Sequence, residues 1–215
     1  MIQLKSPREI DTMAEGGRIL AATLAMLRDS VRAGMTTLEV DRLAEDFIRS
    51  HDGAIPAFKG QYGFTGSVCI SVNQEIVHGI PSAKRVLAEG DIVSLDVGVK
   101  FRGLFTDSAM TVPIGAISAE DQRLLDVTRA SLEAGIAAAQ PGNHIGDIGH
   151  AVQSVVERAG FSVVRELVGH GVGRELHEEP QVPNHGKPRR GTKLMPGLTI
   201  AIEPMVNAGL PGTRT

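Results

Sequence analysis

The stretch SLDVGVKFRGLFTDSAM, residues 94–110, decides the fold. Apolar residues alternate on both sides of a central turn, a pattern that predicts a β-hairpin. Its arms are expected at 92–99 and 104–112, joined by a turn at 100–103 that is centred on Phe101–Arg102. The sequence therefore predicts an antiparallel pair of strands in the middle of the chain.

The predicted hairpin contains an arrangement that a folded protein should avoid. In this register Asp96 and Asp107 face each other with Cβ atoms roughly 5 Å apart, where like charges are destabilising. Three explanations are open: the pair lies on a solvated face, the two groups share a proton, or a cation lies between them. Their neighbours on the same face are small or apolar, unlike the lysines and glutamates of a solvated face.

Length, composition and charge are those of an ordinary globular protein. The chain has 215 residues, 42% hydrophobic and 22% charged, enough for one large domain or two small ones. A net charge of −3 gives no general attraction to nucleic acid or to an anionic membrane. A single cysteine, Cys69, suits a reducing compartment. With no signal peptide and no apolar run of membrane-spanning length, we expect a cytoplasmic protein without DNA or membrane partners.

Apolar residues recur at helical spacing in four segments and at strand spacing in several others. The first helix is expected to begin with Ser6 as N-cap and Pro7 at its first position, and to end before Gly34. The second is expected to begin at the capping sequence 36–39. The later helices are expected at 119–139 and 145–159, and the other strands at 68–72, 75–78, 162–168 and 198–203.

The order of these elements suggests an internal repeat. AGMTTLEVDRLAEDFI and PGNHIGDIGHAVQSVV align with Gly34 against Gly142 and Val40 against Ile148. Any two amphipathic helices that follow a glycine would show some of this similarity, so the alternative of no repeat stays open. Together with the strand order, the alignment favours an α+β fold in which two similar halves share one sheet within a single domain.

Two further residues are candidates for chemistry. His170 lies between glycines, where backbone and ring can approach a ligand closely, although such a histidine can also be a simple turn residue. Glu203 ends an apolar strand pattern just before Pro204, where a surface role is the ordinary alternative. Two aspartates, one histidine and one glutamate form an oxygen-rich set that suits Mn, Fe, Co or Zn ions. Because thiolates are absent from it, a structural zinc site is not indicated.

Five segments carry a family resemblance: VCISVNQEIVHGIP, SLDVGV, FTDSAM, GHGVGRELHEEPQVPN and AIEPMVNAG. In this order they resemble the type I methionine aminopeptidases, whose pita-bread fold is shared with Xaa-Pro aminopeptidases, prolidases and creatinase. The resemblance extends over residues 1–215. It implies an α+β pita-bread fold, with two similar helix-helix-strand halves around a shared curved antiparallel sheet.

The resemblance also implies a site that holds two divalent metal ions, Co, Mn, Fe or Zn. The implied metal ligands are Asp96, Asp107, His170 and Glu203, with Asp107 bridging the ions. His78 and His177 are implied as substrate-contacting histidines. The residues implied to line a methionine pocket are Phe64, Cys69, His78 and Tyr62, although Cys69 alternates with apolar strand residues and is equally explained as a core residue.

By this resemblance the chain is a metal-dependent aminopeptidase that removes the initiator methionine from nascent proteins. A hydroxide held by the two ions attacks the scissile carbonyl, and Glu203 passes the proton to the leaving amine. His177 donates a hydrogen bond to the developing oxyanion, and His78 orients the scissile amide. Nascent N-termini are the expected partners of a monomer. The basic loop GKPRRGTK at 186–193 could contact ribosomal RNA, although a solvated loop is the more ordinary explanation.

The sequence departs from the family pattern at its C-terminal end. The family has a further bridging glutamate on a strand after the AIEPM segment, and the sequence ends at Thr215 before such a strand. We therefore expect residues 1–215 to be a single metallo-aminopeptidase catalytic domain that lacks its C-terminal strand or strands. Leu176 stands where some relatives carry an aromatic residue. The alternatives are an Xaa-Pro peptidase of the same fold, or a catalytically impaired pita-bread module that binds peptides.

Overall fold

The computed structural model describes residues 2–214, which form four α-helices, one 3-10 helix and eight β-strands. The helices are α1 (Pro7–Ser30), α2 (Thr37–Arg49), η1 (Gln61–Gly63), α3 (Ala119–Ala138) and α4 (Ile145–Arg158). The strands are β1 (Ala54–Pro56), β2 (Val68–Val72), β3 (Ile92–Phe101), β4 (Leu104–Pro113), β5 (Ser162–Val163), β6 (Gly169–Gly171), β7 (Glu178–Val182) and β8 (Val206–Asn207).

These elements fall into two compact units. The N-terminal unit comprises residues 7–118 and the short segment 173–176. The C-terminal unit comprises residues 2–6, 119–172 and 177–214. The expected extent of one catalytic domain over the whole chain stays a prediction. Across the described residues, no helix is both long and apolar enough to cross a membrane.

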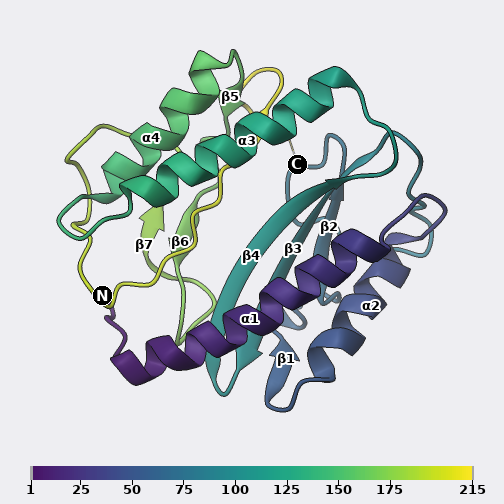
Figure 1. Ribbon diagram of the computed structural model, residues 1–215, viewed down its shortest axis with the longest axis horizontal. Coiled ribbons are helices and arrows are strands. Elements are labelled where there is room, and N and C mark those ends of the chain that lie inside the picture. Colours follow the sequence, from purple (N-terminus) through teal and green to yellow (C-terminus); the bar gives the residue numbers. More distant parts are fainter. Residues whose placement is uncertain (1, 215) are drawn as a thin grey trace. The chain divides into compact units, whose positions relative to one another are not determined.

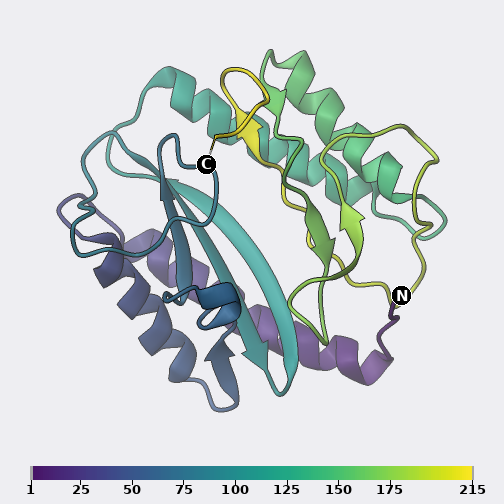
Figure 2. The ribbon, with the colours of Figure 1, turned by 180° about the vertical axis from the view of Figure 1, so that it is seen from behind.

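The N-terminal unit is an antiparallel four-stranded sheet with helices on one face (Figure 1). β4 pairs with one edge of β3 along its whole length, and β1 and β2 pair with successive parts of the other edge. α1 and α2 cover one face, and Figure 2 shows the opposite face, on the side where η1 lies. The sheet therefore has one face against helices and one face available for other contacts.

Alternation along β3 explains which face the helices cover. Its four valine and leucine side chains are fully buried in one cluster with leucines of α1 and apolar residues of α2: Val93, Leu95, Val97 and Val99. Residues between them point to the opposite face, since successive strand residues alternate. Ser94 and Asp96 lie on that face and are half-buried. The hydrophobic core thus fixes the direction in which Asp96 points.

The observed register corrects the predicted one. Phe101 pairs with Leu104, so the turn consists of Arg102 and Gly103, with φ angles of 48° and 89°. Two successive residues with positive φ characterise the type I′ turn that matches the twist of a hairpin. Asp96 pairs with Ala109 and Asp107 with Gly98, so the expected direct opposition of the two aspartates is wrong. They lie on the same face as diagonal neighbours.

The other predictions for this unit have mixed outcomes. Both helices are confirmed, and β2 has the predicted bounds. The expected strand at 75–78 is wrong, because the chain turns back there. The Glu75 carboxylate accepts a hydrogen bond from the Val72 N–H at 2.8 Å, and His78 has a φ of 60°, in the left-handed region. Such local bonding competes with a continuing strand.

In the C-terminal unit α3 packs against α4 next to two short antiparallel ladders, β5–β8 and β6–β7 (Figure 1). Both predicted helices are confirmed. Of the strand expected at 162–168, only Ser162–Val163 forms. The strand expected at 198–203 is wrong: one isolated bridge joins Ile200 to Gly171. Pro204 lacks an N–H group, which limits the ladder that this segment can form.

Candidate metal centre

The N-terminal unit places two candidate metal ligands on the uncovered face of its sheet. Asp96 on β3 and Asp107 on β4 are both half-buried. Diagonal neighbours in an antiparallel pair are roughly 7–8 Å apart, which is within reach of long side chains. Two carboxylates at this distance can both contact a group that lies between them. Cys69 on β2 pairs with Asp96 from the other edge of β3, so three polar groups meet on this face.

The pKa of the Cys69 thiol is affected by both carboxylates. Its side chain is buried, and burial raises the pKa of Cys69 well above its usual range. The negative charges of Asp96 and then Asp107 raise this pKa further. Burial and these two charges therefore both favour the neutral thiol over the thiolate in the metal-free protein. Cys69 fits a wall of the site better than a reactive group.

The C-terminal unit places His170 beside Glu203. His170 lies on β6, and its Nδ1 is 2.8 Å from the backbone oxygen of Gly171. A carbonyl only accepts, so Nδ1 carries the hydrogen. The other ring nitrogen, Nε2, is 3.1 Å from Glu203 Oε1. That carboxylate oxygen is buried and, among residues 2–214, has no partner with hydrogen-bond geometry.

This pair fits a divalent cation. A neutral imidazole with its hydrogen on Nδ1 presents a lone pair at Nε2, which is the common state of a metal-binding histidine held by a backbone carbonyl. A lone pair and a carboxylate oxygen at 3.1 Å repel unless a proton or a cation lies with them. A divalent cation held by both atoms would satisfy the buried oxygen of Glu203 and the Nε2 lone pair together.

The glycines around His170 have a steric role. A Cβ at Gly169 would lie 2.3 Å from the backbone oxygen of Ala201, and one at Gly171 would lie 2.4 Å from that of Glu179. Neither position tolerates a side chain. Ala201 also donates its N–H to the backbone oxygen of His170 at 2.7 Å. The glycines thus let two neighbouring segments approach the strand that carries the histidine.

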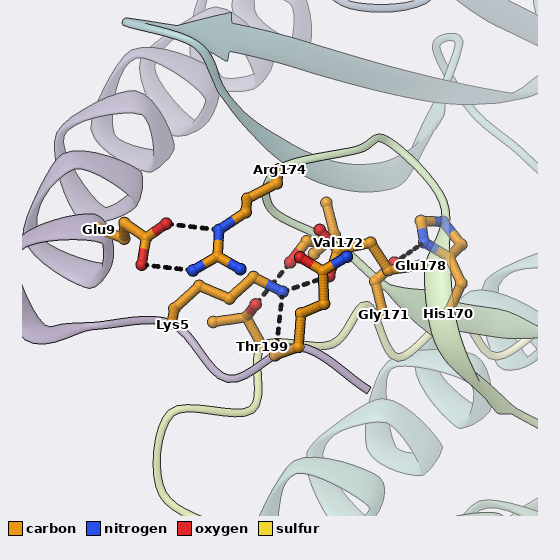
Figure 3. A network of polar contacts seen from close by, with 9 residues as sticks. Lys5, Glu9, His170, Gly171, Val172, Arg174, Glu178 and Thr199 are labelled. Carbon is orange, nitrogen blue, oxygen red and sulfur yellow. Dashed lines mark hydrogen bonds and ion pairs between the residues drawn. The ribbon is translucent and has the colours of Figure 1, made fainter. Parts of the chain in front are cut away.

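His177 directly precedes β7, and its neighbour Glu178 is the first residue of that strand. The ring of His177 meets that of His170 edge to face, with centroids 4.4 Å apart. Glu178 pairs with Gly171 in the ladder, and its carboxylate forms an ion pair with the fully buried ammonium of Lys5 (Figure 3). The ion pair is therefore attached to the same short ladder as the two histidines.

A separate ion pair in the N-terminal unit fixes the segment 173–176. Arg174 forms two hydrogen bonds with the carboxylate of Glu9 on α1, at 2.6 and 2.9 Å (Figure 3). The N–H of Phe105 on β4 donates to the backbone oxygen of Gly173 at 2.7 Å. This four-residue segment is thus held by a helix and a strand of its own unit.

The predicted ligands are divided between the two units. Asp96 and Asp107 belong to the N-terminal unit, and His170 and Glu203 to the C-terminal unit. Within either unit, the described residues contain no group of three or more histidine, cysteine, aspartate or glutamate side chains placed to hold a metal ion. Each unit alone therefore offers a pair of the expected ligands.

A family model for metallopeptidase family M24 matches residues 11–214. The chain belongs to this family. This M24 peptidase is 54% identical to methionine aminopeptidase 1 of Bacillus subtilis over 215 residues, which are all of this chain and 86% of the relative. It is 44% identical to the solved methionine aminopeptidase of Thermotoga maritima, with a TM-score of 0.96, covering 99% of this chain and 85% of that one.

The fold of this M24 peptidase is confirmed as α+β and pita-bread. The prolidase of Pyrococcus horikoshii, 23% identical with a TM-score of 0.79, covers 94% of this chain and 55% of that one, and shows the fold alone. Membership of a metallopeptidase family implies a divalent metal cofactor. The oxygen-rich donor set described above suits such an ion.

His177 lies in the C-terminal unit of this M24 peptidase, and the other predicted substrate residues lie in its N-terminal unit. Tyr62 is 90% exposed on η1, and Phe64, just beyond it, is half-buried. His78 is exposed in the loop after β2, where the next residue, Gly79, accepts a hydrogen bond from the Ile70 N–H at 2.9 Å. Cys69 and His78 are thus tied to the same strand.

Three polar residues next to the candidate site have no predicted role. Lys5 and Glu178 lie far apart in sequence, and no local sequence pattern predicts their ion pair. Asn184 ends the GHGVGRELHEEPQVPN motif, and its Nδ2 donates to the backbone oxygen of Glu203 at 2.6 Å. The motif includes this asparagine, but the burial of its side chain and its hydrogen-bond partner are visible only in the structure.

Proposed function

We propose that this M24 peptidase is a methionine aminopeptidase that removes the initiator methionine from the N-termini of new proteins. The observation that carries the proposal is the pairing of His170 Nε2 with the buried, unsatisfied Oε1 of Glu203, 3.1 Å apart. This pair supplies half of a divalent-cation site in a chain that is 54% identical to a protein named methionine aminopeptidase 1.

The proposed cofactor is a pair of divalent ions, Co, Mn, Fe or Zn. The residues that would hold these ions are Asp96, Asp107, His170 and Glu203. When bound, the metal lowers the pKa of a water molecule toward neutrality and polarises the scissile carbonyl. Three carboxylates and one imidazole suit these ions.

The chain's own groups would move the proton and orient the substrate. Glu203 accepts a proton from the attacking water and delivers it to the amine that leaves. His177 donates a hydrogen bond to the carbonyl oxygen as it gains negative charge, and the edge-to-face contact with His170 orients its ring. His78 contacts the scissile amide, and Phe64, Cys69 and Tyr62 enclose the methionine side chain.

Release of methionine from a Met-Ala-Ser peptide tests this function. We expect release in the presence of Mn²⁺ or Co²⁺ and none after chelation. Glu203→Gln keeps the size of the side chain but removes its base, so kcat should fall roughly 10²- to 10⁴-fold. Glu166→Gln, an exposed glutamate of the same unit, is the matched control and should leave kcat unchanged. Equal activity of the two variants would contradict the proposal.

The same assay separates the alternative functions. Cleavage of Ala-Pro peptides in preference to Met-Ala peptides would favour an Xaa-Pro peptidase, whose fold this chain shares with a prolidase. Peptide binding without methionine release at any metal concentration would favour a catalytically impaired peptide-binding module. Metal-dependent methionine release that is faster than cleavage of Ala-Pro peptides excludes both.

We also propose a monomer in the cytoplasm that contacts ribosomes through the basic loop 186–193. Four exposed cations of this loop support the contact: Lys187, Arg189, Arg190 and Lys193. Two of them, Lys187 and Arg190, line a cavity of about 500 Å³. Binding to phosphate groups should weaken steeply with salt. Cosedimentation with ribosomes at increasing salt tests this contact, and binding that survives replacement of all four cations by glutamine would exclude it.

A further inference from the structure

Asn184 is a buried amide held by one hydrogen bond. Its exposed fraction is 1%, and it follows β7 by two residues. Its Nδ2 donates to the backbone oxygen of Glu203 at 2.6 Å. Its Oδ1 is buried and has no hydrogen-bond partner among residues 2–214. The single bond of this amide therefore ends on the residue whose carboxylate lies beside His170.

The backbone around Glu203 lacks the support that a strand would give it. Residues 201–205 belong to no strand, and the backbone bonds on either side of Glu203 are those from the Ala201 N–H to the His170 oxygen and from the Val164 N–H to the Met205 oxygen. Pro204, the next residue, has no N–H to donate. A backbone carbonyl in such a segment needs another partner when it is shielded from water. The Asn184 amide supplies that partner.

The unpaired oxygen of Asn184 shows which part of the amide matters. A carbonyl only accepts, so the amide must turn its Nδ2 toward Glu203, and this orientation leaves Oδ1 without a partner. A buried unpaired acceptor costs free energy, and each such group in a native structure calls for an explanation. Here the explanation is the bond that the other end of the amide makes.

We propose that Asn184 is a positioning residue for Glu203. By fixing the backbone of Glu203, its amide fixes the direction in which the carboxylate points, so that Oε1 stays 3.1 Å from His170 Nε2. The inference rests on the proposed metal-dependent function, because the geometry that Asn184 maintains is that of two metal ligands. Groups that orient a metal ligand typically change metal affinity roughly 10- to 100-fold when they are removed.

Two variants test the role. Asn184→Asp keeps the shape of the side chain and replaces the donor by an acceptor, and Asn184→Leu keeps the size without adding charge. We expect the Co²⁺ affinity, measured by calorimetry, to fall roughly 10- to 100-fold in both. The visible spectrum of the Co²⁺ form should change, because the ligand geometry changes. kcat for methionine release should fall more than KM rises, since Glu203 acts in the chemical step.

Asn143→Asp is the matched control. Asn143 lies in the same unit, and its Nδ2 donates to the backbone oxygen of Ala138 at 2.9 Å, the same kind of bond away from the candidate site. Its loss should lower the melting temperature of the metal-free protein without changing Co²⁺ affinity or the spectrum. This control separates the loss of an ordinary side-chain to backbone bond from the loss of a positioned ligand.

The outcomes are distinguishable. If the Asn184 variants fold and bind Co²⁺ with the affinity and spectrum of the unaltered protein, the positioning role is overturned, whatever their melting temperatures. If Asn184→Asp does not fold, Asn184→Leu decides by the same measurements. If the unaltered protein neither binds Co²⁺ nor releases methionine, the proposed function fails, and this inference fails with it.

Discussion

The turn before α2 in the N-terminal unit and the turn before α4 in the C-terminal unit have nearly the same backbone. Gly34 and Gly142 both have positive φ, 89° and 96°. Each glycine N–H donates to a returning segment, to Leu87 in one unit and to Leu194 in the other, at 2.8 and 3.0 Å. The two turns lie 108 residues apart in the chain, the offset at which the sequence itself suggests a repeat.

The helix caps that follow these turns also correspond. Glu39 accepts a hydrogen bond from the Thr36 N–H at 2.7 Å, and Asp147 accepts one from the His144 N–H at 2.7 Å. Thr36 forms an isolated antiparallel bridge in its unit, and His144 forms the equivalent bridge in the other. The two helix starts therefore form corresponding hydrogen bonds, although few of their side chains are the same.

The strands of the two units differ much more than the helices do. β3 and β4 have ten residues each, whereas the strands of the C-terminal unit have between two and five. Glycines that permit close approach and prolines that cannot donate interrupt the latter. His170 and Glu203 lie in these interrupted segments. The helix starts of the two units therefore correspond more closely than the strands do, and the candidate ligands of the C-terminal unit lie in the segments that differ.

The largest expected change in stability comes from comparing one ion pair of each unit. Lys5 and Glu178 of the C-terminal unit have side-chain exposures of 0% and 6%. Lys5→Met would remove the ammonium group that faces this buried carboxylate, so the free energy of unfolding should fall by about 3–5 kcal/mol. Lys59 of the N-terminal unit is 43% exposed, and its partner Glu45 keeps a second bond to Arg49. Lys59→Met should cost about 0–1 kcal/mol.

Urea unfolding followed by circular dichroism measures both changes. The control is the double variant Lys5→Met with Glu178→Met, which replaces both charges by apolar groups. It should recover most of the stability lost in the single variant, because the cost arises from the uncompensated charge. A loss below about 1 kcal/mol for Lys5→Met would mean that the two ion pairs are equivalent after all.

The elements that could be predicted from the sequence are those whose signals are local. α1 begins at Pro7 and α2 after the Thr36 capping box, as the sequence indicates. Alternation predicts the long hairpin, but its register depends on turn chemistry. The glycine at 103 was the available signal for a two-residue turn, and centring the turn one residue earlier brought Asp96 directly opposite Asp107 instead of diagonal to it.

The remaining features depend on contacts between distant segments. β6 and β7 contain glycine and proline at positions where propensity opposes a strand, and only their pairing makes them strands. His170 and Glu203 could be selected by residue type and context. The sequence does not show that Glu203 Oε1 is buried beside the imidazole, nor that Asn184 holds its backbone. These roles depend on which atoms are buried, and burial cannot be read from the identity of a single residue.

A smaller effect tests whether the two helix-starting turns are equivalent. Gly34→Ala and Gly142→Ala should each lower unfolding free energy by about 1–2 kcal/mol, because an L-residue with a side chain is strained at positive φ. A Cβ at either position meets no atom within 4 Å, so backbone conformation is the whole cause. Thermal melting of both variants measures the change. Losses that differ by more than about 1 kcal/mol would break the equivalence of the turns.

The smallest effect concerns the caps and their pH dependence. The backbone N–H of Thr36, and then its hydroxyl, lower the pKa of Glu39, and the backbone N–H groups of His144 and Arg189 lower the pKa of Asp147. Because each folded-state pKa lies below the unfolded value of about 4, each carboxylate stabilises the fold above pH 4. That stabilisation is lost as the pH falls through the lowered pKa. The melting temperatures of Glu39→Gln and Asp147→Asn should therefore lie below that of the unaltered protein at pH 7 and approach it in acid.

The two caps should differ in how distant the residues are that they stabilise. Among residues 2–214, the Glu39 carboxylate accepts hydrogen bonds from Thr36, three residues away, whereas Asp147 also accepts the Arg189 N–H at 2.9 Å and so holds the basic loop 186–193. Hydrogen exchange at the Arg189 amide should accelerate in Asp147→Asn. In Glu39→Gln, faster exchange should stay at Thr36 and its neighbours. If both variants change exchange only at their own helix starts, the C-terminal cap is as local as its counterpart, and the difference between the units is confined to their strands.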